Sequence, residues 1–189
     1  MRGSPFSLRP VPVKPIKTRH RRIGTSLPVP ASIPFLKSLN RTESQSMHGQ
    51  LPVIWDHARG ASVWDRWGNR WIDFTSTIFV ANAGHAHPHI VRSLRDQLQR
   101  GMLHSYTFAT EARVRFLESL VRTAGRPFEK AFLVSSGTEA TEAALKLMRL
   151  HGLSKNSKKV NIISFRGSMH GRTMGAELLK GNQEGSAWI

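Results

Sequence analysis

Short apolar runs alternate with helical patterns in the C-terminal half of the chain. The run 131–134 has the length of a strand, and small residues follow it at 135–138. Apolar residues then recur at helical spacing, at Ala140, Ala143, Ala144, Leu147 and Met148. The pattern predicts a core strand, a tight turn and a helix that ends at Gly152.

A second unit of the same kind comes next. Residues 160–165 form another apolar run, which we predict to be a second core strand, and the glycine-rich segment 166–176 follows it. Two strand–turn–helix units in succession are typical of an α/β domain with a largely parallel sheet. Such sheets bind ligands at the turns that follow their strands.

The N-terminal half contains a hairpin pattern. Two strand-like runs, 61–65 and 70–74, flank Trp67-Gly68-Asn69. Because Gly and Asn tolerate the positive φ of a tight turn, we predict a β-hairpin here.

Helical spacing of apolar residues predicts two helices between the hairpin and residue 131. The first runs from Ile90 to about Gly101 and the second from about Thr110 to Thr123. Before the hairpin, residues 1–30 are rich in Pro, Arg and Ser, so we expect a disordered extension, followed by irregular chain over 33–49.

Composition narrows the class of protein. The chain has 189 residues, enough for one domain with a core, and it has no Cys, which excludes disulfides and cysteine-based zinc sites. Its net charge is +16, and the first 42 residues hold nine Lys or Arg and no Asp or Glu. A transit peptide and a basic arm for nucleic acid or lipid are the alternatives to a disordered extension. We expect no nucleic-acid partner and no membrane span.

The turn at 135–138 is the first candidate site. A helix that begins after small residues leaves backbone N–H groups free for an anion, and Gly137 lets the anion approach closely. The turn contains neither a P-loop nor a G-x-G-x-x-G motif, so ATP and dinucleotides are not the expected ligands. The alternative is an ordinary helix capped by Ser136 or Thr138.

Three alternating histidines, His85, His87 and His89, form a second candidate. They would share one face of a strand and could bind zinc. However, Pro88 disrupts a central strand, and no Cys, Asp or Glu lies close by in sequence. We therefore expect a turn that leads into a helix, and no metal site.

The order of these motifs resembles that of the class III aminotransferases, pyridoxal-phosphate (PLP) enzymes of fold type I. Four segments carry the resemblance, which extends from about Pro52 to Ile189: the residues 71–74 that end the hairpin, Gly-His-Ala-His-Pro at 84–88, Ser-Ser-Gly-Thr-Glu-Ala at 135–140, and His-Gly-Arg-Thr at 170–173 with Gly-Ala at 175–176. Within the family, the chain is most similar to 4-aminobutyrate and related ω-amino-acid aminotransferases.

The resemblance implies roles for seven residues. Ser136, Gly137 and Thr138 would hold the PLP phosphate through N–H and hydroxyl groups. Arg172 would bind the substrate carboxylate, and Ile78 would line the substrate pocket. Met169 stands at the ring-stacking position, and His170 lies beside it.

Two departures from the family pattern matter. Met169 replaces the Phe or Tyr that usually stacks on the cofactor ring, and a thioether packs there differently. The family's Asp for the pyridine nitrogen and its Schiff-base Lys lie downstream of His-Gly-Arg, and neither region occurs in this sequence. Lys146 and Lys180 do not match that lysine, so we assign no catalytic residue within this chain.

The resemblance therefore implies an N-terminal fragment of a transaminase, and we expect the fragment to be inactive alone. The full-length enzyme would move an amino group from an amino donor, an ω-amino acid, to a 2-oxo acid. It would be a homodimer and would be located in the cytoplasm or in mitochondria. The expected fold is α/β, an N-terminal segment plus the first half of the large mixed or parallel-sheet domain. Its expected divisions are an extension at 1–42, a hairpin segment at 43–83 and PLP-domain residues at 84–189. A racemase or mutase of the same fold, and a truncated non-catalytic relative, are the alternatives.

Overall fold

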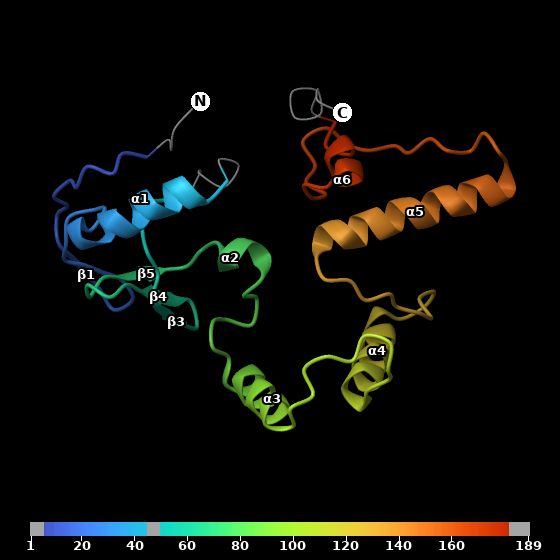
Figure 1. Cartoon of the computed structure of the whole chain (residues 1–189), viewed down its shortest axis with the longest axis horizontal. Coiled ribbons are helices and arrows are strands. Elements are labelled where there is room, and N and C mark those ends of the chain that lie inside the picture. Colours follow the sequence, from blue (N-terminus) through green and yellow to red (C-terminus); the bar gives the residue numbers. More distant parts are fainter. Residues whose placement is uncertain (1–5, 45–49, 182–189) are drawn as a thin grey trace. The chain divides into compact units, whose positions relative to one another are not determined.

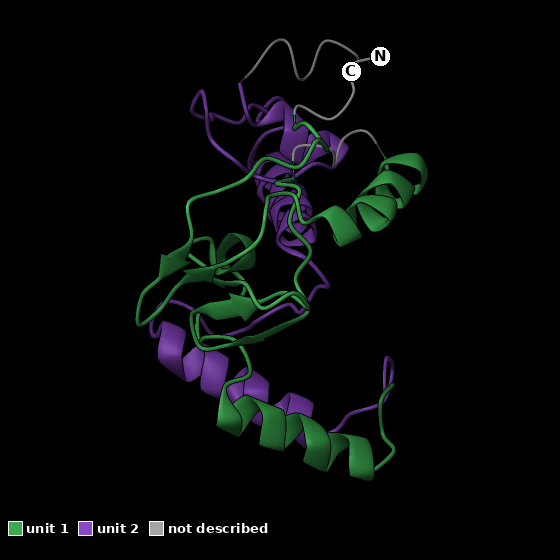
Figure 2. Cartoon of the chain, turned by 90° about the vertical axis from the view of Figure 1, so that its left-hand side faces the viewer, with its two compact units in different colours: residues 1–104 green, residues 105–189 purple. Residues whose placement is uncertain are grey.

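The computed structural model of the chain describes residues 6–44 and 50–181 (Figure 1). Contacts divide the chain into two compact units, residues 1–104 and 105–189 (Figure 2). This division differs from the expected boundaries after residues 42 and 83. The segment 84–104 belongs to the first of these units, and its expected place at the beginning of the cofactor domain stays a prediction.

The first unit contains a five-stranded antiparallel sheet. Its strand order is β1-β2-β5-β4-β3. The strands are β1 (Ile16–Lys17), β2 (Arg22–Ile23), β3 (His57–Arg59), β4 (Ser62–Trp64) and β5 (Arg70–Ile72). The predicted hairpin is confirmed, since β4 pairs with β5 and places the fully buried Val63 opposite Trp71.

The N-terminal segment is more regular than its composition predicts. Strands β1 and β2 extend the sheet beyond β5, where we expected a disordered extension. The expectation of irregular chain over 33–49 is wrong for α1 (Ile33–Thr42), whereas residues 45–49 lie outside the described residues. Pro34 lies in the first turn of α1, where the missing N–H costs no helical hydrogen bond.

A buried polar network ties this segment to the hairpin. Asn69 and Asp65 are buried at the turn between β4 and β5. Asn69 Oδ1 accepts from the Gly24 N–H at 2.9 Å, and its Nδ2 donates to Thr25 Oγ1 at 2.8 Å and to Asp65 Oδ2 at 2.7 Å. Asp65 Oδ1 also accepts from the Trp67 and Asn69 N–H groups. One side chain thus shapes the turn and holds residues 24–25 against it.

The helices are α2 (Ser76–Phe79), α3 (Pro88–Gln99), α4 (Glu111–Ala124), α5 (Gly137–Lys155) and α6 (Met174–Leu178), with a short 3₁₀ turn, η1 (Pro30–Ser32), before α1. Helices α3 and α4 confirm the two predicted from helical spacing. Helix α5 continues one turn beyond Gly152, the residue at which we expected it to end. Gly152 is buried because the Lys159 carbonyl lies where a Cβ would stand.

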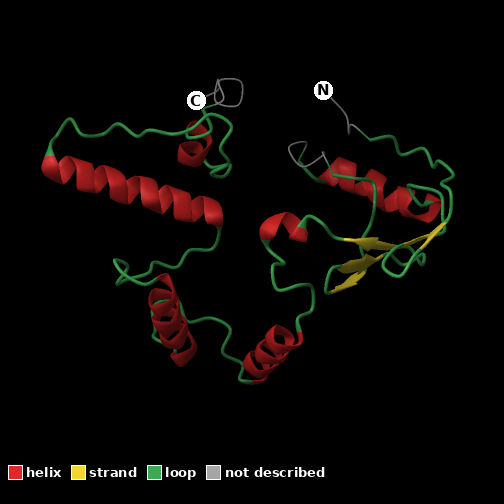
Figure 3. Cartoon of the chain, turned by 180° about the vertical axis from the view of Figure 1, so that it is seen from behind, coloured by secondary structure: helices red, strands yellow, loops and turns green. Residues whose placement is uncertain are grey.

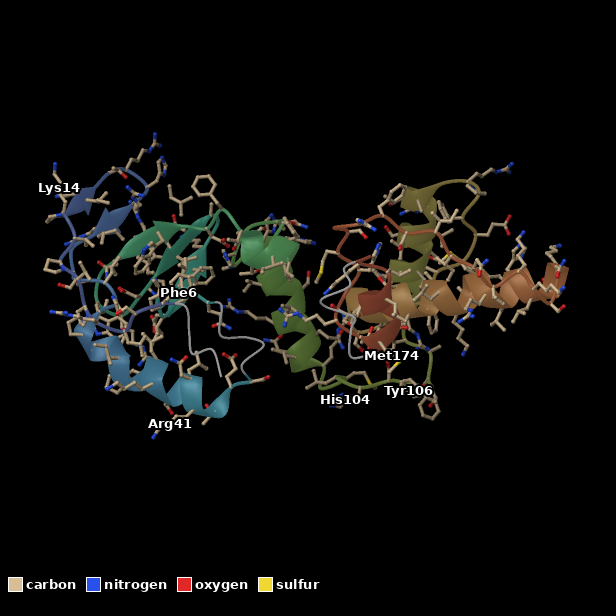
Figure 4. All side chains as sticks on the ribbon, turned by 90° about the horizontal axis from the view of Figure 1, so that it is seen from above. Phe6, Lys14, Arg41, His104, Tyr106 and Met174 are labelled. Atoms are coloured by element: carbon tan, nitrogen blue, oxygen red, sulfur yellow. The ribbon has the colours of Figure 1, made fainter. Side chains whose placement is uncertain are left out.

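The two expected core strands of the second unit do not form in the structure. Residues 131–134 and 160–165 carry no strand assignment, and the strands drawn in Figure 3 all belong to the sheet of the first unit. Large apolar side chains in these segments are exposed, with 76% of Phe132 and 93% of Ile163 accessible. Leu147, Met148, Leu150 and Leu153 of α5 are likewise exposed. Figure 4 draws the side chains of this helix as sticks.

Candidate functional site

The turn before α5 is a capping box. Ser136 is the N-cap residue, and its hydroxyl oxygen accepts the Glu139 N–H at 3.3 Å. The Glu139 carboxylate accepts in return from the N–H groups of Ser135 and Ser136, at 2.7 and 3.2 Å. Of our two candidate caps, the structure selects Ser136. The spacing Ser-x-x-Glu, visible in the sequence, is the signal that would have identified Glu139.

The capping box leaves two donors at the start of α5. Within the described residues, neither the Gly137 nor the Thr138 N–H makes a hydrogen bond. Both lie at the positive end of a 19-residue helix. Apart from its two chain neighbours and the backbone of α5 itself, no described atom lies within 4 Å of the position that a Gly137 Cβ would occupy, so an anion can reach the backbone there.

The loop that carries His170 and Arg172 meets this turn. The hydroxyl oxygens of Thr138 and Thr173 are 2.8 Å apart. Gly171 has a φ of +132°, and a Cβ at this position would overlap the Thr138 side chain. A glycine is therefore required for the loop to lie against α5. Thr138 and Thr173, which are 35 residues apart in the sequence, bring the two motifs into contact.

Glu142 anchors the far side of the same loop. Its Oε1 accepts from the Thr173 hydroxyl and from the Ala176 N–H, the latter at 3.1 Å. The Thr173 hydroxyl, and then the Ala176 and Gly175 N–H groups, lower the pKa of Glu142 against the opposing effect of burial. Glu142 belongs to no motif that we identified in the sequence, although it lies four residues after Thr138 and therefore on the same face of α5.

The other loop residues are placed near this contact. His170 is partly buried, whereas Met169 and Arg172 are exposed. In the described part of the chain, no hydrogen bond joins Met169 or His170 to Ser136, Gly137 or Thr138. The structure thus brings the loop that carries Arg172 to the turn before α5 through Gly171 and Thr173.

Ile78 lies in the first unit, in a strained turn. Helix α2 has positive φ at four consecutive residues, from 49° at Ser76 to 68° at Phe79, so it is left-handed. A left-handed conformation is costly for a β-branched residue, and such strain clusters at functional sites. The side chain of Ile78 is 76% accessible, which leaves it available to a ligand.

Asp73 holds the segment before Ile78 and pairs with the first histidine of the Gly-His motif. Its carboxylate accepts from the Thr75 hydroxyl and N–H, at 2.7 and 2.8 Å, and lies 2.8 Å from His85 Nε2. These bonds, led by the Thr75 hydroxyl, lower the pKa of Asp73 to about 2, although burial acts in the opposite direction. No acidic residue lies close to the histidines in the sequence, and only the fold brings Asp73 to His85.

The other two histidines are exposed, and the described residues contain no group of three potential ligands for a metal ion. The same residues include no helix that is both long enough and apolar enough to cross a bilayer.

Comparison with known proteins identifies related chains. The family model described as aminotransferase class-III matches residues 44–185. An ornithine aminotransferase from Saccharomyces cerevisiae is 37% identical over 150 residues, which cover 78% of this chain and 35% of the relative. An acetylornithine aminotransferase from Nitrosomonas europaea is 36% identical over 140 residues, with 74% and 35% covered. The chain thus spans about a third of the length of these relatives.

The fold agrees with this relationship. A taurine:2-oxoglutarate aminotransferase from Bifidobacterium kashiwanohense, solved with PLP and glutamate, aligns with a TM-score of 0.68 and 28% identity over 82% of this chain and 34% of that one. The α/β chain, with its antiparallel sheet, is consistent with part of a fold type I PLP enzyme. Since the family model covers most of the chain, this protein belongs to the class III aminotransferases.

Proposed function

We propose that this chain supplies the cofactor-phosphate and substrate-carboxylate contacts of an aminotransferase that moves an amino group from an ω-amino acid to a 2-oxo acid. The names of the relatives support ornithine or acetylornithine as the donor. The 4-aminobutyrate branch that the sequence suggested stays a second candidate for the donor. The observation that carries the proposal is the contact between the α5 turn and the Arg172 loop.

The residues at the turn fit the cofactor of this family, which is PLP. The free N–H groups of Gly137 and Thr138 point to a dianionic phosphate at the positive end of α5. The Ser136 hydroxyl accepts one hydrogen bond and keeps its proton for a phosphate oxygen. The negative charge of Glu139 is already neutralised in part by the two N–H groups that it accepts.

The remaining roles concern the substrate. Arg172 has the planar guanidinium that suits a carboxylate, and Ile78 presents an apolar side chain for the carbon chain of the donor. Met169 would pack on the ring face with its thioether, beside His170. When bound, PLP supplies the electron sink for carbanion chemistry next to the amine. No lysine of this chain is assigned to the proton transfer, so we propose binding without turnover by the chain alone, and a homodimer for the complete enzyme.

A comparison of ligands with and without a phosphate tests whether the turn before α5 binds the phosphate of PLP. The chain is titrated with PLP and with pyridoxal, which lacks the phosphate, while the amide signals of Gly137 and Thr138 are followed by NMR. We expect PLP to shift both signals at concentrations at least about tenfold lower than pyridoxal, because each charged hydrogen bond adds roughly 1.5–3 kcal/mol. Equal affinities for the two compounds would refute the phosphate site.

A matched variant separates charge from folding. Ser136→Asp keeps a good N-cap but places a negative charge at the turn. We expect this variant to retain the α5 helix and to lose PLP binding. Ser136→Thr, which keeps both the cap and the neutral hydroxyl, should bind like the wild type.

The carboxylate assignment is tested at Arg172. In Arg172→Ala, binding of ornithine and of 4-aminobutyrate to the PLP-loaded chain should weaken by about tenfold or more, whereas binding of an amine without a carboxylate should not change. Equal weakening of all three amines would show that Arg172 does not recognise the carboxylate.

A further inference from the structure

Glu142 acts as a cap for a helix other than its own. Thr173, the N-cap residue of α6, makes no capping hydrogen bond with its side chain. The Glu142 carboxylate of α5 accepts the Ala176 N–H instead, together with the Thr173 hydroxyl. The carboxylate therefore fixes the position of the first turn of α6 against α5.

Glycine at 175 makes this contact close. A Cβ at Gly175 would lie 2.5 Å from Glu142 Oε2 and 2.8 Å from Leu145 Cδ1. At the other end of the loop, a Cβ at Gly171 would likewise overlap the Thr138 side chain. The loop is thus held at both ends against residues 138–145 of one helix, which leaves little freedom for the Thr138–Thr173 pair.

The charge on Glu142 decides the direction of the hydrogen bond between the two threonines. An ionised carboxylate accepts hydrogen bonds and cannot donate one, and the lowered pKa keeps Glu142 ionised at neutral pH. Thr173 therefore gives its only hydroxyl proton to Glu142. In the 2.8 Å contact between the hydroxyls, Thr138 must then be the donor.

This direction changes what Thr138 offers to an anion. Its single hydroxyl proton is directed to Thr173, so the oxygen presents lone pairs to the turn. A phosphate oxygen would meet an acceptor there and not a donor. The N–H groups of Gly137 and Thr138 and the Ser136 hydroxyl are then the donors of the turn.

We propose that Glu142 is a positioning residue that orients the Thr138 hydroxyl away from the cofactor phosphate, through Thr173, so that Thr138 contributes its backbone N–H alone. The inference rests on the proposed function, since it concerns how the same turn binds phosphate. It differs from the hydroxyl role that the family resemblance implied for Thr138.

Binding of inorganic phosphate and of PLP to variants of the full chain tests this assignment. Thr138→Val removes a hydroxyl that does not face the phosphate, and we expect affinity within about twofold of wild type. Thr173→Val frees the Thr138 proton, and we expect binding to tighten by roughly threefold to tenfold, the effect of one added hydrogen bond. Thr173→Ser keeps the hydroxyl donor in place and should match the wild type, whereas the amide of Glu142→Gln can donate to Thr173 as well as accept from it, so binding should tighten in the same direction as in Thr173→Val.

The opposite pattern would overturn the proposal. If Thr138→Val weakens phosphate binding by fivefold or more, the hydroxyl donates to phosphate in the wild type. Circular dichroism on each variant separates such losses from unfolding, and Thr138→Val decides the question if Thr173→Val disturbs the loop.

A second measurement needs no phosphate. The acid titration of Glu142 is followed at the Ala176 amide by NMR. Charged residues near Glu142 on the two helices include Glu139, held in its capping box, Lys146, one turn further along α5, and Glu177 and Lys180, which pair with each other at 2.6 Å. Arg172 and the titratable His170 lie on the loop itself. We expect the midpoint to rise in Thr173→Val, because the strongest donor to the carboxylate is lost, and to stay unchanged in Thr138→Val.

The two measurements distinguish a failure of the proposed function from a failure of the inference about Glu142. If wild type binds no phosphate but the Thr173→Val midpoint rises, the proposed function of the turn is wrong and the direction of the hydroxyl pair stands. If the midpoint does not rise, Thr173 does not donate to Glu142, and the inference is wrong whatever phosphate does.

Discussion

Similar apolar patterns occur at residues 57–72 and at the two segments 131–134 and 160–165, yet only the first region forms a sheet. In the first region, each strand finds its partner across a short turn, so β3, β4 and β5 pair in sequence order. The other two segments are separated by α5 and pair with no strand in the described part of the chain. Antiparallel neighbours can be joined by a two-residue turn, whereas parallel strands require a long crossover.

This difference indicates which interactions stabilise each region. The hairpins satisfy their backbone groups locally, and β2 adds to them through the Asn69 network. The α5 region satisfies its helix ends with Ser136, Glu139 and Glu142 but leaves its apolar segments exposed. Its order therefore comes from polar contacts between α5 and α6 more than from a core.

Hydrogen exchange should show this contrast most strongly. Amides in β4 and β5 are expected to exchange at least about a hundredfold more slowly than amides at 131–134 and 160–165, because only the strands are held in ladders. Exchange followed by mass spectrometry on the whole chain measures both regions together. Equal protection of the two regions would mean that 131–134 and 160–165 are paired in solution, which would contradict the contrast between the two regions.

The Asn69 network gives the next largest effect. Asn69→Ala removes the bonds to Gly24, Thr25 and Asp65, and we expect the first unit to lose roughly 2–3 kcal/mol of stability. Urea unfolding followed by tryptophan fluorescence measures this, since four of the five Trp residues lie between 55 and 71. The control is Asn82→Ala, at an exposed residue with one long hydrogen bond. A small effect would show that β1 and β2 are held by other contacts.

Acid should weaken the first unit through Asp73. Its pKa in the folded chain is lowered to about 2, so its stabilising contribution is complete above about pH 4 and is lost as the pH falls through 2. Asp73→Asn should lower the urea midpoint at pH 7, by an amount equivalent to about 1–2 kcal/mol, and flatten the decline between pH 4 and 2. An unchanged decline in this variant would assign the acid sensitivity to other carboxylates.

The smallest expected change concerns the left-handed turn at α2. Ile78→Gly relieves a β-branched residue with a φ of 61° and removes a side chain that is mostly exposed. We expect stability to rise by up to about 1 kcal/mol, since the strain relieved slightly exceeds the added entropy of the unfolded chain. Ile78→Val, which keeps the strain, should leave the urea midpoint unchanged. Loss of stability in Ile78→Gly would show that the Ile78 side chain packs in solution.

Local patterns in the sequence predicted the elements whose partners are local. The hairpin followed from Gly68 and Asn69 between two apolar runs, and α3, α4 and α5 followed from helical spacing. The order of short motifs indicated the family, and the family model confirms it over 44–185. These features can be predicted from the sequence because a turn, a helix or a motif is specified by residues that are close together in the chain.

Contacts between distant residues were decided by the tertiary structure alone. Asp73 reaches His85, Asn69 reaches Gly24, and Glu142 reaches Thr173, each across a separation that no local pattern encodes. The order in β1 and β2 also comes from such contacts, since a proline-rich segment has little tendency to form strands without a sheet edge to join. The direction that we propose for the Thr138 hydroxyl depends on Thr138, Thr173 and Glu142 lying together in the fold, and no local pattern in the sequence indicates it.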